Sequence, residues 1–225
     1  IYTNTNKRYH TYNYFLKSKF NKKTIKISLN GSFTCPNIDG TKGTNGCIYC
    51  SSKGSGDFGG NPIYSIHEQF NSVKGILLNK WPNSVFIAYF QANTNTYAPL
   101  PRLKQLFEDA LSLDDVVGLS ISTRPDCVTE EIADYLCDLS KRTFLTVELG
   151  LQTIHDKTAK YINRCHTFDD FLQGYNMLIK RGINVCIHII NGLPFETHDM
   201  MLKTAEIVAR LHPHSVKIHL LHVIE

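Results

Sequence analysis

The chain has 225 residues, of which 42% are hydrophobic and 20% charged, and a formal net charge of +4, which suits one sizeable globular domain with its own core. No apolar run reaches the roughly 20 residues that cross a bilayer, and the first residues lack the apolar segment of a secretory signal peptide, which argues against a membrane or secreted protein. Seven cysteines, an odd number with three close together, favour metal binding in a reducing compartment over disulfides, so we expect a cytoplasmic protein.

The chain begins with a basic segment: residues 1–38 contain seven lysines and arginines and no acidic residue. Aromatic residues are interleaved with these charges, at Tyr2, Tyr9, Tyr12, Tyr14, Phe15 and Phe20. Two interpretations stay open. The segment contacts the phosphates and bases of a nucleic acid, or it is an amphipathic extension whose aromatic rings pack on the core. We expect residues 1–23 to form an N-terminal extension to a core at residues 24–225.

Beyond this extension, strand and helix patterns alternate. Apolar, β-branched runs predict strands at 24–29, 85–90, 116–122, 144–149, 183–190 and 215–221. Helical spacing predicts helices at about 64–80, 100–113, 129–141, 167–181 and 197–211, with Gly182 placed to end the fourth. Such alternation is typical of an α/β fold with a parallel sheet and right-handed crossovers. Six units predict a partial (βα)6 barrel of the TIM type.

Five distinctive motifs follow the predicted strands. In chain order they are a cysteine-containing loop, QANTNTY, TRPD, GLQT and NGLPFET, after strands one to five. In barrels of parallel strands, catalytic groups gather at the carboxyl ends of the strands. The sequence therefore predicts one functional site formed by these motifs.

The loop after the first strand contains Cys35, Cys47 and Cys50, spaced C-x11-C-x2-C among glycines and asparagines. Thiolates select zinc, copper(I) or iron–sulfur clusters. A zinc site needs a fourth ligand, and the nearest histidines, His10 and His67, do not lie at a zinc-finger spacing. A cubane cluster held by three cysteines leaves one iron open to a substrate or cofactor. The cysteines alone leave both alternatives open.

Several motifs together resemble one family. KISLNGSFTCPN, GCIYC and GSGDFGG resemble the radical S-adenosylmethionine (SAM) superfamily, and more closely a bacterial subgroup related to the catalytic subunit of elongator. The resemblance continues through FQANTNTYAP, STRPDC, VELGLQT, INGLPFET and KIHLLHV, so it covers nearly the whole chain. Ile38 departs from the arginine expected there in the subgroup. The chain ends after the sixth strand, where relatives continue, so we expect their C-terminal segment to be absent.

The resemblance implies a 4Fe–4S cluster held by the three cysteines, with SAM bound at the fourth iron. Tyr49 would cover the cluster and meet the adenine, Gln152 would bind the ribose, and Arg164 would pair with the SAM carboxylate. His219 and His222 would line the substrate side. The other implied SAM-binding residues are Gln91, Asn93, Thr94, Ser122, Thr123, Arg124, Glu148, His188 and Asn191.

The implied reaction is reductive cleavage of SAM to methionine and a 5′-deoxyadenosyl radical, which takes a hydrogen atom from the substrate. A one-electron donor of the flavodoxin or ferredoxin type would supply the electron. The elongator-like motifs and the basic, aromatic segment point to tRNA, with the wobble-uridine side chain as the expected target. The alternatives are a small-molecule substrate, a non-catalytic, zinc-stabilised RNA-binding module, and an acyltransferase, for which the chain has no second domain.

Overall fold

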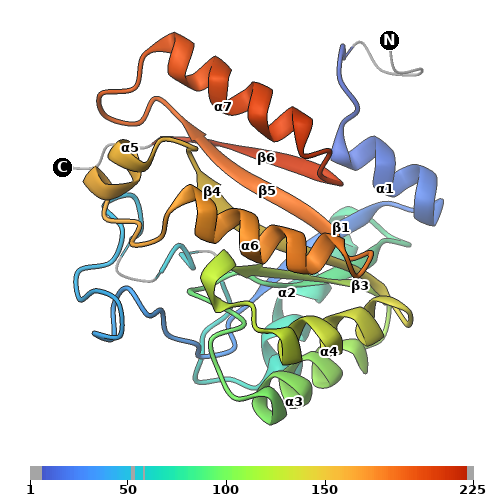
Figure 1. Cartoon of the computed structure of the whole chain (residues 1–225). Coiled ribbons are helices and arrows are strands. Elements are labelled where there is room, and N and C mark those ends of the chain that lie inside the picture. The colour runs from blue at the N-terminus through green and yellow to red at the C-terminus, as the bar shows by residue number, and fades with distance from the viewer. Residues whose placement is uncertain (1–6, 52–53, 58, 222–225) are drawn as a thin grey trace.

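The computed structural model describes residues 7–51, 54–57 and 59–221. At its centre is one six-stranded parallel sheet whose strands lie in chain order. The strands are β1 Thr24–Leu29, β2 Val85–Phe90, β3 Val116–Thr123, β4 Phe144–Gln152, β5 Asn184–Asn191 and β6 Ser215–Leu220. The sheet curls into a half-barrel (Figure 1), which confirms the predicted partial (βα)6 barrel.

Helices cover the outer face of the sheet (Figure 1). The long ones are α2 Ile66–Lys80, α3 Leu100–Leu111, α4 Glu130–Ser140, α6 Phe168–Ile179 and α7 His198–Arg210. Three shorter helices are α1 Tyr12–Phe20, the 3₁₀ turn η1 Pro125–Cys127, and α5 Asp156–Tyr161. Across the described ranges, no helix combines the length and apolar character needed to span a membrane.

Successive residues of the strands face two different environments, as the two-residue period of a strand requires. Toward the helices, β1 to β5 present one continuous apolar core, to which β2 contributes Phe86 and Phe90 and β4 contributes Val147, whereas the apolar side chains of β6 are exposed. The side chains between them point into the half-barrel, where polar groups from all six strands meet. These are Lys26, Tyr89, Ser120, Glu148, His188 and Lys217. The interior of the barrel is therefore polar, although its strands read as apolar runs.

Two strands extend past their apolar sequence. β3 continues to Thr123, and β4 continues to Gln152, which pairs with Ile189 of β5 after a shift in register. Polar residues at these strand ends keep the sheet pairing while turning their side chains to the barrel mouth. Helix α5 was not predicted, because six residues are too few to display a helical period. The fourth predicted helix ends at Ile179, and Gly182 follows with a φ of +70°, as expected after a helix.

Helix α1 packs against the amino-terminal end of the half-barrel. The ring centroids of Phe15 and Phe20 lie 5.9 and 5.7 Å from that of Phe144 at the start of β4. The Lys26 ammonium lies 5.1 Å from the centre of the Tyr12 ring. These aromatic side chains pack on the core, in agreement with the second interpretation of the basic segment. Tyr2 lies outside the described residues.

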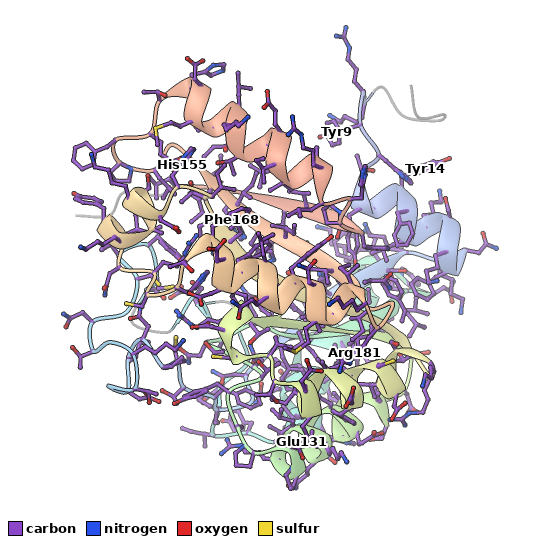
Figure 2. All side chains as sticks on the ribbon, in the orientation of Figure 1. Tyr9, Tyr14, Glu131, His155, Phe168 and Arg181 are labelled. Carbon is purple, nitrogen blue, oxygen red and sulfur yellow. The ribbon has the colours of Figure 1, made fainter. Side chains whose placement is uncertain are left out.

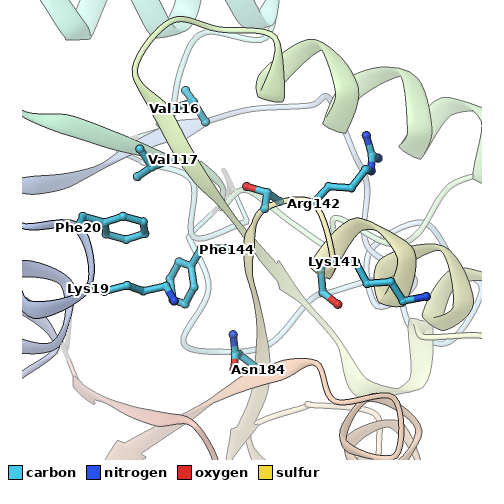
Figure 3. Close-up of a pocket in the computed structure, with 10 residues that line it drawn as sticks. Lys19, Phe20, Val116, Val117, Lys141, Arg142, Phe144 and Asn184 are labelled. Carbon is cyan, nitrogen blue, oxygen red and sulfur yellow. The ribbon is translucent and has the colours of Figure 1, made fainter.

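A cavity of about 520 Å³ opens beside α1, at the amino ends of β3, β4 and β5 (Figure 3). Two of its basic groups have acidic partners, since Lys141 lies 2.8 Å from Asp138 and Arg142 pairs with Glu108. The third, the Lys19 ammonium, lies 5.0 Å from the centre of the Phe144 ring. Tyr9 and Tyr14 lie at this same α1 end of the molecule, opposite the cysteine-containing loop (Figure 2). The basic, aromatic segment is thus remote from the carboxyl ends of the strands.

Helix α6 approaches the turn after β3 so closely that Gly174 has no room for a side chain. A Cβ there would meet the Pro125 carbonyl oxygen, whereas a Cβ at Gly75 in α2 would meet nothing within 4 Å. We expect Gly174→Ala to lower the free energy of unfolding by about 1–3 kcal/mol through overpacking. The matched change Gly75→Ala should raise it by roughly 0.5–1 kcal/mol, because alanine favours a helix. Urea denaturation measures both, and equal effects would contradict this account of the contact.

Candidate active site

A cavity of about 590 Å³ opens at the carboxyl ends of the strands. Thirteen of the fifteen residues that the sequence suggests for binding the cluster and SAM line it. They are Cys35, Cys47, Tyr49, Cys50, Gln91, Asn93, Thr94, Ser122, Thr123, Arg124, Gln152, Arg164 and His188. Glu148 lies buried behind the cavity wall, and Asn191 is exposed at the end of β5. His219 also lines the cavity, whereas His222 lies outside the described residues.

All three cysteines are half-buried, and two of them receive hydrogen bonds from side chains that the sequence did not single out. The Asn37 amide donates to Cys47 Sγ at 3.4 Å, and the Ser55 hydroxyl donates to Cys50 Sγ at 3.3 Å. A hydrogen bond from the Cys50 thiol, helped by Tyr49 and Asn37, lowers the pKa of Cys47 to about 6. A thiolate is the form that binds metals. Asn37 also donates to the backbone carbonyl of Asn163, which fixes the loop against the end of α5.

The polar residues after β2 mainly hold this loop in place. Gln91 accepts from the Ser28 hydroxyl at 2.8 Å and donates to the Ser55 carbonyl at 3.0 Å. Asn93, with a φ of +61°, donates from its side chain to the Phe33 carbonyl at 2.9 Å. The Thr94 backbone N–H donates to the carbonyl of Thr34. The NTNT turn therefore joins the start of the cysteine loop to the sheet.

Two arginines, Arg124 and Arg164, form part of the cavity wall near the cysteine loop. Arg124 makes two 2.9 Å hydrogen bonds to the carboxylate of Asp126 and a third, of 2.8 Å, to the Arg164 carbonyl. Arg164 is fully buried, and its guanidinium donates to the backbone carbonyls of Leu151, Thr153 and His166. Lys42 of the cysteine loop also pairs with Asp126. Both guanidinium groups are thus occupied by hydrogen bonds within the protein.

Gln152 differs from these residues because one of its polar atoms is uncommitted. In the described part of the chain, its buried side-chain oxygen has no hydrogen-bond partner. Its φ of +65° is unusual for a residue other than glycine, and strain of this kind costs of order 1–3 kcal/mol. A strained backbone and an open acceptor beside a cavity mark a position suited to a ligand.

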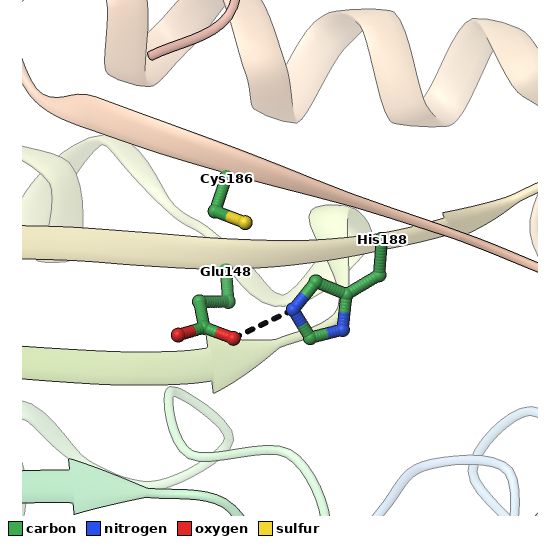
Figure 4. Close-up of side chains that lie close together, drawn as sticks. All are labelled: Glu148, Cys186 and His188. Atoms are coloured by element: carbon green, nitrogen blue, oxygen red, sulfur yellow. Dashed lines mark hydrogen bonds and ion pairs between the residues drawn. The ribbon is translucent and has the colours of Figure 1, made fainter. Parts of the chain in front are cut away.

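Glu148 is the centre of the polar interior, and its carboxylate accepts hydrogen bonds from several strands. The donors are the Lys26 ammonium, the Ser120 hydroxyl at 2.5 Å, the Tyr89 hydroxyl at 3.1 Å and His188 Nε2 at 2.6 Å (Figure 4). Burial alone would raise the pKa of Glu148, but the His188 hydrogen bond and the charges of Lys26 and Lys217 hold it well below its ordinary value. The carboxylate is therefore ionised, and His188 Nε2 carries the proton that it donates.

This arrangement extends to the cavity through a second histidine. His188 Nδ1 lies 3.1 Å from His219 Nε2. Burial lowers the pKa of both imidazoles, to about 4 for His219, so both are neutral near pH 7. Because His188 Nε2 donates to Glu148, its Nδ1 accepts from His219, which leaves His219 Nδ1 as an acceptor. The sequence motifs predict His188 and His219 at the site, but they do not indicate Lys26 and Lys217.

Glu148, Cys186 and His188 place one ligand atom each within 4.8 Å of one another, a spacing that also suits a metal ion (Figure 4). The Lys26 ammonium already binds the carboxylate, and burial raises the pKa of the Cys186 thiol to about 11. An ammonium and a neutral thiol are poor neighbours for a cation. We assign the trio to the polar interior and not to a metal site.

The half-barrel and the three cysteines at its mouth define a class of protein, and comparison with known proteins identifies it. The family model of the radical SAM superfamily matches residues 38–208, so the chain belongs to that superfamily. The superfamily uses a 4Fe–4S cluster and SAM. The match confirms the family resemblance and the cofactors expected from the sequence.

Individual relatives place the chain more closely. The protein YtqA of Bacillus subtilis (strain 168) is 53% identical over 224 residues, covering 100% of this chain and 70% of YtqA. A tRNA uridine(34) acetyltransferase of Methanocaldococcus jannaschii is 35% identical over 85 residues, covering 37% of this chain and 15% of the relative. The solved archaeal Elp3 of Methanocaldococcus infernus has a TM-score of 0.63 at 19% identity, covering 90% of this chain and 46% of that one. The fold is thus shared with Elp3, of which this chain spans about half.

The buried Glu148 contacts suggest one test of stability. Glu148→Gln would leave Lys26 and His188 without their anion, and we expect a loss of about 3–5 kcal/mol in the free energy of unfolding. The control Glu206→Gln removes an exposed partner of Lys203 and should cost within about 0.5 kcal/mol. Urea denaturation at pH 7 measures both. A small effect at Glu148 would show that the interior is not organised by its charge.

The lowered pKa of His219 predicts a pH dependence. The unfolded chain, with a histidine pKa of 6.5, binds a proton that the folded protein accepts only near pH 4. The contribution of His219 to stability is therefore complete above pH 6.5 and lost as the pH falls toward 4. We expect His219→Gln to flatten the fall in unfolding free energy across this window. The control His198→Gln, at an exposed histidine, should leave the profile unchanged.

Proposed function

We propose that this protein cleaves SAM reductively and uses the resulting radical to modify tRNA, with the side chain of the wobble uridine as the target. The observation that carries the proposal is the convergence of Cys35, Cys47 and Cys50 on one cavity at the carboxyl ends of the strands. Three thiols with hydrogen-bond donors beside two of them suit the ligation of a cluster through three irons. The cysteines fit the cofactor that the superfamily uses.

The cysteines would hold the 4Fe–4S cluster. Bound there with SAM, it would supply the one-electron cleavage to methionine and a 5′-deoxyadenosyl radical. Asn37 and Ser55 would stabilise the thiolates through their hydrogen bonds to sulfur. The electron would come from a flavodoxin or ferredoxin type of donor.

Whether a residue is proposed to contact SAM depends on whether its polar atoms already have hydrogen-bond partners within the described part of the protein. Gln152 would accept a hydrogen bond from a ribose hydroxyl through its open oxygen. Tyr49 would flank the cluster, with its backbone toward the adenine. Arg164 is occupied by backbone carbonyls, so we propose that it shapes the wall, and that a direct pairing with the SAM carboxylate would require it to release one of them. Asn191 would contact bound groups only at the rim.

The other candidate residues would position the groups that contact the cofactors, without contacting SAM themselves. Gln91, Asn93 and Thr94 would set the position of the cysteine loop, and Ser122, Thr123 and Arg124 would form the wall below it. Glu148 would position His188 and, through it, His219. His219 Nδ1 would face the substrate side as a hydrogen-bond acceptor.

The tRNA assignment rests on two supports. One is the partial similarity to a tRNA uridine(34) acetyltransferase, and the other is an open half-barrel that admits a large substrate beside the cavity. The aromatic residues of α1 do not add support, because they pack on the core at the other end of the molecule.

The first experiment assays SAM cleavage anaerobically, on protein reconstituted with iron and sulfide and reduced with dithionite. We expect 5′-deoxyadenosine from the parent and only background amounts from Cys47→Ala. The control Cys137→Ala removes a thiol of α4, outside the cavity, and should keep both product and cluster absorbance. Colourless protein that contains zinc and forms no product would overturn the proposal in favour of a zinc-stabilised RNA-binding module.

The second part of the assay adds unfractionated tRNA from cells that lack the protein. Mass spectrometry of its nucleosides should show a tRNA change that depends on SAM and on Cys47. SAM cleavage without any change in tRNA would favour a small-molecule substrate. Loss of tRNA binding on raising the salt concentration would report phosphate contacts.

A further inference from the structure

Two aromatic side chains stand exposed beside the mouth of the cavity. Tyr161, at the end of α5, is 53% exposed, and Phe195, in the loop after β5, is 81% exposed. Their ring centroids lie 4.8 Å apart with an interplanar angle of 82°. We call Tyr161 and Phe195 the rim pair. Two large rings that contact each other yet remain open to solvent are candidates for binding a partner.

The rim pair is attached to the cavity wall. The residues next to it in sequence, Ile162 and Leu193, are buried in a small apolar cluster with Ile190, against which Tyr49 packs. The Ile162 carbonyl accepts a hydrogen bond of 3.1 Å from the backbone N–H of Ile48 in the cysteine loop. Tyr49, Ile48 and Ile190 line the cavity. The pair therefore lies on the outer side of the wall whose inner side faces the cysteine loop.

The loop holds Phe195 in a costly conformation. Its φ is +66°, which is a true outlier for a bulky side chain. The next residue fixes it: the Glu196 carboxylate accepts a 2.5 Å hydrogen bond from Thr153, and the Glu196 N–H donates to the Leu193 carbonyl at 3.1 Å. The structure thus maintains strain while exposing most of the ring, so burial does not explain the position. Strain kept without a packing benefit is characteristic of binding sites.

Two basic side chains lie beside the pair. Lys157 and Lys160 are exposed on α5, and Lys157 lies four residues before Tyr161, on the same side of the helix. The two nearby acidic side chains make contacts within the protein. Asp156 accepts from the Phe168 N–H at 2.8 Å and lies 3.6 Å from Arg164, and Glu196 is bound by Thr153. Exposed rings beside ammonium groups match the bases and phosphates of single-stranded nucleic acid.

We propose that the rim pair is a stacking platform for an unpaired base of the RNA substrate, next to the nucleotide that enters the cavity. This inference rests on the proposed tRNA function. The aromatic residues that contact RNA are then the rim pair and not those of the N-terminal segment, which pack on the core at the opposite end of the barrel. Lys157 and Lys160 contact the phosphates that flank the stacked base.

The test measures binding of end-labelled, unfractionated tRNA by fluorescence anisotropy, under anaerobic conditions with the reconstituted protein. Tyr161→Ala and Phe195→Ala should each raise the dissociation constant about five- to a hundredfold, as the loss of one stacked base does. Tyr161→Phe and Phe195→Tyr keep the rings and should bind within about twofold of the parent. Ile76→Ala is the matched control, since Ile76 is 72% exposed on α2.

A further variant separates binding from folding. Phe195→Gly relieves the positive φ, so its melting temperature should equal or exceed that of the parent while tRNA binding weakens. A residue kept only for the fold would lose stability instead. If the parent binds tRNA and the alanine variants bind it equally well, the stacking platform is wrong, while the proposed tRNA function stands.

SAM cleavage without tRNA supplies the remaining distinction. It should be unchanged in every rim variant, because the pair lies outside the cavity lining. A parent that cleaves SAM but does not bind tRNA would overturn this inference together with the tRNA assignment. Specific capture of a protein on the pair in place of tRNA would also overturn it.

Discussion

One buried carboxylate organises the half-barrel. Glu148 of β4 contacts a side chain from each of the other five strands: Lys26, Tyr89, Ser120, His188 and Lys217. A buried anion is tolerable only when it is paired and hydrogen-bonded, and these groups provide both. The side chains of the polar interior consequently have one preferred arrangement. This arrangement also fixes the relative positions of the strand ends at the cavity. Glu148 does not line the cavity, but it holds His188, which does.

Each strand has an apolar outer face and a polar inner face, and on both faces a buried side chain needs a suitable partner. On the outer face of β1 to β5, apolar side chains are buried against the helices, and this burial is the main favourable contribution to folding. On the inner face, each polar group needs a partner from a neighbouring strand, which favours the curvature that brings β1 and β6 toward β4. The barrel therefore encloses a polar space, with α1 packed at one end and a cavity open at the other.

The outer and inner faces of the strands differ in how clearly the sequence indicates them. The apolar runs located all six strands and the five long helices, because burial imposes the helix and strand periods. The inner face carries a weaker signal: Lys26 in TIKISL and Lys217 in SVKIHL alternate with apolar residues, and this two-residue period places both lysines on the face opposite the apolar one. Asn37 and Ser55 had no such signal, since loop geometry alone brings their donors to the cysteines.

The candidate residues divide according to whether their polar atoms are free for a ligand. Sequence position at a strand end located nearly all of them at the cavity, but position does not reveal hydrogen bonding. Arg164 and Asn93 are satisfied within the protein, whereas the Gln152 oxygen and the three thiols remain available. Because an occupied donor must break a bond before it binds a ligand, the available atoms determine where binding costs least. They lie at the cysteine loop and the end of β4, so the cofactor side of the cavity is the preorganised one. On the substrate side, exposed rings and lysines lie at the rim, where the proposed RNA substrate would complete the site.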